Sequence, residues 1–307
     1  MTGRGRTCVA LVLVVWAALF SGCVGRAGQG ETAGGALPPQ RAVRVVTDDL
    51  GRTITIPAEL ARVVSLAPNL TENIFAVGGG DRLVGVTTFC DFPAQARSIA
   101  KVGDTMSPNM ETIVGLKPDV VFVSTASQIE TFAETLNRNG IQVYVTNPDS
   151  LDAVLRNLLQ LGEIFGTLPQ AEKVVGDLRE RIELVKARGE GKEPQRVFVQ
   201  ISREPLFTIG KGSFLTSMLE TAGARSVTAD VETAYPKLSK ETAAALAPDA
   251  IILSDSEDNR EPNEVFRRSP AVLNGRVIRV NADIISRPGP RLVDALEQIG
   301  EMLHTDK

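Results

Sequence analysis

One phrase occurs twice in the chain, 130 positions apart. Residues 111–124 read ETIVGLKPDVVFVS and residues 241–254 read ETAAALAPDAIILS. Both copies predict a short helix, a Pro-Asp turn and a buried strand, because a short apolar run bounded by turn residues is typical of a strand inside a sheet. A second echo, at an offset of 145, relates Leu70, Thr71 and Gly78 to Leu215, Thr216 and Gly223. Two similar lobes in one chain predict a cleft between them, where a ligand would bind.

The N-terminus carries the pattern of an export signal. Arg4 and Arg6 precede an apolar run from Cys8 to Phe20, and Ser-Gly-Cys23 follows. The run is too short to span a bilayer comfortably, so residues 1–22 are predicted to be a lipoprotein signal peptide that leaves Cys23 as the lipidated first residue. The alternative is a plain cleaved signal without lipid.

Residues 23–42 are rich in Gly and Ala and predict a flexible tether. The expected location is therefore the periplasm or the outer face of the cytoplasmic membrane, with the protein anchored by lipid. Cys90 would be the one remaining thiol, so no internal disulfide is possible. The net charge of −4 becomes more negative once the signal and its two arginines are removed, which argues against a nucleic-acid partner. A monomer is expected.

The body of the chain predicts an α/β fold with two Rossmann-like lobes. Apolar runs at Val43–Val46 and Thr53–Ile56 predict a hairpin, and strands then alternate with helices, the pattern of parallel sheets covered on both faces. We expect an N-terminal lobe at 43–166, a linker helix at 167–190 and a C-terminal lobe at 191–307. The amphipathic linker helix falls between the two copies of the repeat.

The residue types present in the chain exclude most catalytic mechanisms. The single histidine, His304, lies near the C-terminus, which excludes histidine triads and zinc sites built from several histidines. With one thiol at Cys90, thiolate clusters are excluded too, so neither a metal nor a cofactor is expected. The segment from Gly210 to Ser213 predicts either a plain turn or an anion-binding loop. Carboxylate pairs keep a periplasmic hydrolase open as a remote alternative to a binding protein.

In open parallel sheets, ligands bind beyond the carboxyl ends of the strands. That rule selects the following candidates: Asn69, Phe89, Cys90, Asp91, Phe92, Met106 and Ser127 in the first lobe, and Phe207, Tyr235, Asp283 and Arg287 in the second. Aromatic and apolar surface mixed with a few polar groups suits a bulky amphipathic ligand. Phe92, which precedes a proline, is expected in the core. Cys90 is either buried or in contact with ligand, and Asp283 with Arg287 could be a surface ion pair only.

Two glutamates occupy equivalent positions in the repeat. Ser107 and Ser239 are predicted as N-caps, which places Glu111 and Glu241 in first helical turns. There each carboxylate would gain about 0.3–1 kcal/mol from the helix dipole, and that account suffices for either one. As a pair, one per lobe, they could also dock onto basic residues of a partner.

Five segments in order resemble one family. They read VTDDLGRTITIP, RVVSLAPNLTENIFAVG, VGVTTFCDFP, ETIVGLKPDVVFVS and RPGPRLVDALEQIG. Together they resemble the ABC-transporter substrate-binding lipoproteins of the cobalamin and ferric-siderophore group. The resemblance implies the class III periplasmic-binding-protein fold, with two α/β lobes joined by a single long helix and no catalysis. It also implies that Glu111 and Glu241 engage arginines of the ABC permease.

The resemblance also bears on the ligand. The segment DIISRPGPR is similar to cobalamin-binding members, which implies that Asp283 and Arg287 contact a corrinoid such as cobalamin or cobinamide. The loop FCDFP implies ligand contacts at Phe89 and Asp91, and Phe207 and Tyr235 fall at aromatic positions of those members. The chain departs from them in having no tryptophan in the mature body, with Met106 and Ile284 where larger aromatics are expected. A ferric siderophore is the alternative cargo. Haem has less support, because only Tyr144 and Tyr235 could ligate the iron.

Overall fold

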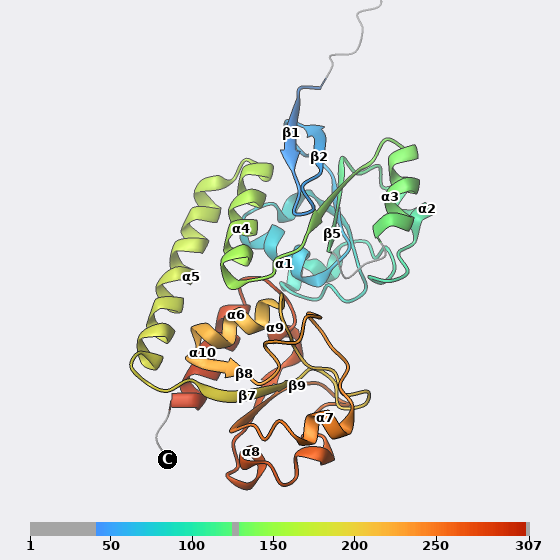
Figure 1. The fold of residues 1–307 in the computed structure, drawn as a ribbon. Helices are drawn as coiled ribbons and strands as arrows, with labels where there is room; N and C mark the ends of the chain where they lie inside the picture. The colour runs from blue at the N-terminus through green and yellow to red at the C-terminus, as the bar shows by residue number, and fades with distance from the viewer. Residues whose placement is uncertain (1–40, 125–128, 305–307) are drawn as a thin grey trace, which may run out of the picture. The chain divides into compact units, whose positions relative to one another are not determined.

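Two separate parallel sheets form the framework of the chain (Figure 1). The computed structural model describes residues 41–124 and 129–304, without the side chains of 129–132; the predicted signal peptide, Cys23 and Ser127 lie outside these residues. The strands of the first sheet are β3 (Val63–Ser65), β4 (Leu83–Val86), β5 (Val120–Ser124) and β6 (Gln142–Thr146), and those of the second are β7 (Gln195–Gln200), β8 (Ala224–Ser226), β9 (Ala250–Asp255) and β10 (Val277–Asn281).

Both sheets share one topology. Their strand orders are β4-β3-β5-β6 and β10-β9-β7-β8, with every pairing parallel. If the strands of each lobe are numbered one to four in chain order, both sheets have the spatial order 2-1-3-4. The prediction of two α/β lobes is confirmed.

The sequence repeat is also a repeat of hydrogen bonds. The residue after the repeated leucine has a positive φ in both copies, 48° and 42°. In each lobe an arginine at the start of the first strand binds the carbonyl of that leucine: Arg62 donates to Leu116 over 2.9 Å, and Arg196 to Leu246 over 2.8 Å. The first strand of each lobe is thus tied to the turn that leads into its third strand.

Helices cover both faces of the sheets. The first lobe contains α1 (Pro68–Ala76), η1 (Gly80–Arg82), η2 (Ala94–Ser98), α2 (Met110–Gly115), α3 (Ile129–Arg138) and α4 (Leu151–Phe165). The second contains α6 (Phe214–Thr221), α7 (Lys240–Ala244), η3 (Glu264–Phe266), α8 (Pro270–Leu273), α9 (Ala282–Ile285) and α10 (Leu292–His304).

The predicted hairpin opens the first lobe, ahead of its parallel sheet. Strands β1 (Val43–Thr47) and β2 (Thr53–Pro57) pair antiparallel. The buried carboxylate of Asp48 fixes the turn, because it accepts hydrogen bonds from the backbone and the guanidinium of Arg52 at 2.6–2.9 Å. It also accepts from the amide of Val145 at 3.3 Å, which attaches the hairpin to β6.

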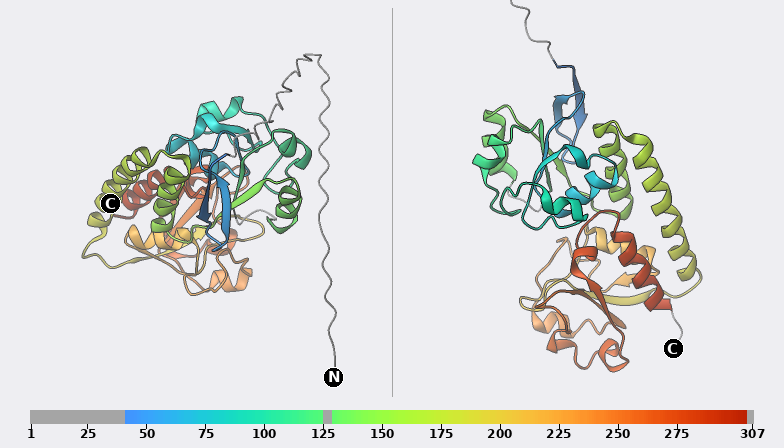
Figure 2. Two further views of the ribbon diagram at one scale, coloured as in Figure 1. Left: turned by 90° about the horizontal axis from the view of Figure 1, so that it is seen from above. Right: turned by 180° about the vertical axis from the view of Figure 1, so that it is seen from behind.

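One long helix, α5 (Leu168–Gly189), connects the lobes and packs on α4 of the first and α10 of the second (Figure 2). Glycines permit both approaches. A Cβ on Gly162 of α4 would lie 2.4 Å from the Cβ of Ala171, and one on Gly300 of α10 would lie 2.6 Å from a methyl of Val185. Because Cβ atoms essentially never come that close, α5 is held at both ends at distances that only glycine allows.

The buried face of α5 belongs to a hydrophobic cluster that continues through both lobes. It includes side chains from β2 in the first lobe to α10 in the second. Arg181 of α5 adds ion pairs to Asp294 and Glu297 on α10. The connection is therefore a packed structural element, which limits how far the lobes can move apart.

Candidate ligand-binding cleft

A cavity of about 470 Å³ lies between the two lobes. The first lobe lines it with Asn69, Ser124, Thr146, Asn147 and Pro148, and the second with Ile201, Gly212, Phe214, Leu215, Ala234, Tyr235, Ser286 and Pro288. Ser124 ends β5 and Thr146 ends β6, so the cavity opens at the carboxyl ends of parallel strands, where ligands bind in such sheets.

The two walls of this cavity differ in chemistry. The first-lobe wall carries carboxamides and hydroxyls, whereas the second-lobe wall is mostly aliphatic and aromatic. Among the described residues that line it, none is Asp, Glu, Lys or Arg. The cavity is therefore suited to an uncharged ligand surface that is polar on one side and apolar on the other.

Two of the predicted candidates border the cavity: Asn69 from the first lobe and Tyr235 from the second. Tyr235 is 43 % exposed as a whole. The burial of its hydroxyl raises the pKa of that group, and the smaller effect of Ser213 lowers it. Ser213 also caps α6 by accepting from the amide of Leu215. The Gly210–Ser213 segment forms a turn in which the amide of Ser213 donates to the carbonyl of Gly210 at 3.3 Å. Only glycine fits at position 210, because a Cβ there would lie 2.3 Å from the carbonyl oxygen of Thr233.

Three other predicted residues meet in an ion cluster that crosses from one lobe to the other. Arg287 donates to Asp283 at 2.6 Å, to Asp91 at 3.1 Å and to Glu72 of α1 at 2.9 Å. Its neighbours Ser286 and Pro288 border the cavity, so the cluster lies at the cavity edge. We call Glu72, Asp91, Asp283, Arg287 and Arg291 the interlobe ion cluster.

Glu72 is the centre of this cluster and was not predicted. It is 3 % exposed at its side chain and accepts two further hydrogen bonds from Arg291, at 2.8 and 2.6 Å. The guanidinium of Arg291 in turn lies 4.1 Å from the ring centroid of Phe92. One first-lobe carboxylate therefore holds two second-lobe arginines, a geometry in which charge-assisted bonds are strong.

The cluster changes the acidity of its members. Burial tends to raise the pKa of Asp91, but the hydrogen bond and charge of Arg287 outweigh it, so the pKa is lowered overall. Burial likewise opposes the charged form of Arg287, yet Glu72 and Asp91 raise its pKa above the ordinary value. Asp91 and Arg287 are therefore both charged at neutral pH, and they form an ion pair with each other.

Three further predicted residues lie outside the cavity lining. Phe89 and Met106 are 59 % and 51 % exposed on first-lobe loops, and Phe207 is half-buried in bridges to Ser202 and Lys237. None of the three borders the cavity.

Two of the loop interpretations can be judged directly. The expectation that Phe92 is a core residue is wrong: its ring is 44 % exposed, where Arg291 covers it. Cys90 is buried, with its sulfur 3.1 Å from the hydroxyls of Thr71 and Thr87.

Glu111 and Glu241 are both exposed in the first turns of α2 and α7. The predicted cap Ser239 is confirmed, since it accepts from the amide of Thr242. The predicted cap Ser107 is wrong. Asn109 caps α2 instead, while the amide of Ser107 is bound by the carboxylate of Asp104 in the preceding turn. The pKa of Glu241 is lowered by its own backbone amide and by Ser239.

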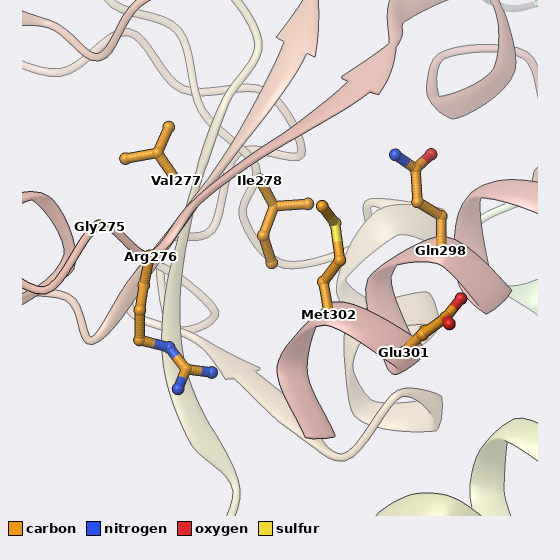
Figure 3. Close-up of a pocket in the computed structure, with 7 residues that line it drawn as sticks. All are labelled: Gly275, Arg276, Val277, Ile278, Gln298, Glu301 and Met302. Carbon is orange, nitrogen blue, oxygen red and sulfur yellow. The ribbon is translucent and has the colours of Figure 1, made fainter. Parts of the chain in front are cut away.

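A second cavity, of about 490 Å³, belongs to the second lobe alone (Figure 3). It lies at the amino end of β10, beside the last turns of α10, with Ile278 and Met302 on its border. Because ligands of parallel sheets bind at the opposite strand ends, we assign the ligand site to the interlobe cavity.

Comparison with known proteins identifies the architecture. The family model described as "Periplasmic binding protein" matches residues 63–283. The chain belongs to the periplasmic binding protein family. An uncharacterized ABC transporter substrate-binding lipoprotein, YvrC of Bacillus subtilis (strain 168), is 32 % identical over 95 % of this chain and 97 % of its own length. A vitamin B12-binding protein of Vibrio cholerae is 31 % identical over 79 % of this chain and 88 % of that protein.

Solved structures agree with this family fold. The periplasmic vitamin B12 binding protein BtuF of Vibrio cholerae superposes with a TM-score of 0.70 at 29 % identity, covering 80 % of this chain and 98 % of BtuF. A possible iron-binding periplasmic protein of Staphylococcus epidermidis gives 0.68 at 26 % identity, covering 80 % of this chain and all of that one. Periplasmic haem-binding proteins at about 22 % identity share the fold.

Membership in the family determines the general role. This periplasmic binding protein is the substrate-binding component of an ABC transporter; it has a small-molecule ligand and a permease partner, and it is not an enzyme. The hydrolase alternative is therefore wrong. Within residues 41–124 and 129–304, no helix combines the length and the apolar character needed to cross a membrane.

Proposed function

We propose that this periplasmic binding protein captures a corrinoid, cobalamin or cobinamide, between its lobes and delivers it to an ABC permease. The observation that carries the proposal is the interlobe cavity with an uncharged lining. A corrin presents a broad apolar face and a rim of neutral amide side chains, which matches one apolar wall and one polar wall. Relatives named vitamin B12-binding protein, at 31 % identity, support the same cargo.

The other predicted ligand contacts have a role in this proposal. Tyr235 supplies apolar area in the cavity, and the exposed side chains of Phe89 and Met106, which lie outside the lining, would meet parts of the ligand that project from it. Phe207 supports a second-lobe loop through its bridges to Ser202 and Lys237. Asp91, Asp283 and Arg287 would meet the ligand periphery from the cavity edge, exchanging some bonds of the interlobe ion cluster for bonds to ligand.

The alternative cargoes have less support. An anionic siderophore needs cationic partners, and the described lining supplies none, which leaves neutral ferric hydroxamates as the siderophore alternative. Haem needs an iron ligand. Tyr144 is 1 % exposed in the first-lobe core and burial raises its pKa, so only Tyr235 of the two tyrosines could serve.

Calorimetric titration of the mature protein with cyanocobalamin, dicyanocobinamide and a ferric trihydroxamate tests the proposal. We expect one corrinoid per chain, displaced by the other corrinoid but not by the hydroxamate. If the hydroxamate binds and neither corrinoid gives a binding heat, the proposed corrinoid ligand is wrong and a ferric siderophore takes its place.

We further propose that Glu111 and Glu241 dock the lobes onto the permease. Both are exposed at helix N-termini, one in each copy of the repeat. The double variant Glu111→Arg, Glu241→Arg is expected to keep its affinity for cargo and to lose uptake in cells. Unchanged uptake would remove these residues from the docking surface.

We also propose that Cys23 carries the lipid that anchors the protein outside the cytoplasmic membrane. Its B. subtilis relative is named a lipoprotein. Cys23→Ser is expected to move the protein from the membrane fraction to the soluble fraction, because acyl chains supply about 0.8 kcal/mol per buried CH₂. Retention of the variant on membranes would point to another anchor.

A further inference from the structure

A carboxamide without a partner borders the interlobe cavity. Asn69 follows β3 at the start of α1 and is 7 % exposed. Its side chain makes no hydrogen bond with any residue in the described ranges, although it can donate two and accept two. An amide that has no protein partner and is open to a cavity is available to hydrogen-bond a ligand there.

A second unpaired group lies in the same wall. Thr146, the last residue of β6, is 3 % exposed, and its hydroxyl has no partner in the part of the chain that the structure describes. It stands in register with Ser124 of β5, which also lines the cavity.

These groups form a row along the strand ends. Strand β5 lies between β3 and β6; Ser124 and Thr146 are the last residues of β5 and β6, and Asn69 lies four residues beyond the end of β3, in the first turn of α1. Neighbouring strands are about 4.8 Å apart, a spacing that allows a row of hydrogen bonds to successive groups of one ligand edge. We call Asn69, Ser124 and Thr146 the polar row.

The opposite wall offers little competition for those hydrogen bonds. Ile201, Phe214 and Leu215 line the cavity from the second lobe, and Ser286 there donates its hydroxyl to the carbonyl of Ala282. A ligand must therefore turn its hydrogen-bonding edge toward the first lobe and its apolar face toward the second.

We infer that the polar row selects neutral primary amides on the ligand, with Asn69 as the main specificity-determining residue. A carboxamide pairs with a primary amide through two complementary hydrogen bonds, one donated and one accepted. A ligand carboxylate in the same place cannot donate, so one of the two hydrogen bonds is replaced by a repulsive contact between oxygens. It also places a negative charge against a lining that contains no Lys or Arg among the described residues. This inference rests on the proposed function, since it identifies which edge of a corrinoid is recognised.

The test compares two ligands on the mature protein: cyanocobalamin, and its derivatives in which one side-chain amide is hydrolysed to a carboxylate. Wild-type protein is expected to bind the amide form about 10- to 100-fold more tightly than at least one of the acids. Asn69→Ala should lose about tenfold or more for cyanocobalamin and little for that acid, so that the preference collapses. Thr146→Val should reduce the preference in the same direction.

Asn137→Ala, at an exposed position of α3, is the matched control and should bind as wild type does. Circular dichroism melts verify that each variant is folded. If wild-type protein binds corrinoids but Asn69→Ala and Thr146→Val keep the full preference for the amide, the inference is overturned and the proposed function stands. If wild-type protein binds neither corrinoid, both are overturned.

Discussion

Replacing Glu72 by glutamine tests how strongly the interlobe ion cluster stabilises the protein. The carboxylate of Glu72 accepts three hydrogen bonds, one from Arg287 and two from Arg291, at 2.6–2.9 Å. Its side chain is 3 % exposed and that of Arg287 is 11 % exposed, so water replaces little of what is lost. Glutamine keeps the shape but removes the charge and turns one acceptor into a donor that faces a guanidinium.

The magnitude follows from burial. Removing one partner of a buried ion pair costs about 3–5 kcal/mol, because the other charge remains without compensation. Arg287 keeps Asp91 and Asp283, and Arg291 is 21 % exposed, so we expect a smaller loss of about 2–4 kcal/mol in the free energy of unfolding. Urea unfolding followed by circular dichroism measures it as a shift of the midpoint at unchanged slope.

Asp283→Asn is the matched control from the same cluster. Its side chain is 53 % exposed, and exposed pairs contribute about 0–1 kcal/mol, so this variant should stay close to wild type. A Glu72→Gln protein within 0.5 kcal/mol of wild type would refute the reasoning, because the arginines would then not depend on Glu72.

Two further predictions concern acidity and helix packing. Because the pKa of Asp91 is lowered in the folded protein, its contribution to stability is present above its ordinary pKa of 3.8 and is lost as the pH falls through the lowered value. The difference in urea midpoint between wild type and Asp91→Asn should therefore shrink as the pH is lowered from 6 toward 3; a difference that grows would contradict the sign. Gly162→Ala and Gly300→Ala should each destabilise by about 1–3 kcal/mol through overpacking against α5. Gly176→Ala, exposed on α5 with nothing within 4 Å of its Cβ, should stabilise by about 0.5–1 kcal/mol, and equal melting temperatures for all three would contradict close packing.

The sequence predicted the architecture because the fold repeats itself. The duplicated segments 111–124 and 241–254 span a helix, a Pro-Asp turn and the third strand of each lobe, and local signals such as the apolar run of β5 or β9 suffice to recognise them. The matching arginines, Arg62 just before β3 and Arg196 at the start of β7, were available as a further signal.

The candidate site was predicted less completely, since its main contacts join distant segments. Glu72 and Arg291 are 219 positions apart, and nothing in the local sequence marks the glutamate of this helix as buried. Phe92 was misjudged for the same reason, because the group that covers it is Arg291 of the other lobe. The wrong N-cap prediction at Ser107 has a local cause. The carboxylate of Asp104 accepts a hydrogen bond from the amide of Ser107 in a turn, and the N-cap of α2 is Asn109, two residues later.

The glycine contacts of α5 bear on how cargo is exchanged. A hinge built from a loose loop would let the lobes swing freely, but here any swing must bend a 22-residue helix or lift it from Gly162 or Gly300. We therefore expect cargo to enter past the rim loops with little rearrangement. Release would then require force from outside, which an ABC transporter docked on both lobes, as proposed for Glu111 and Glu241, could apply.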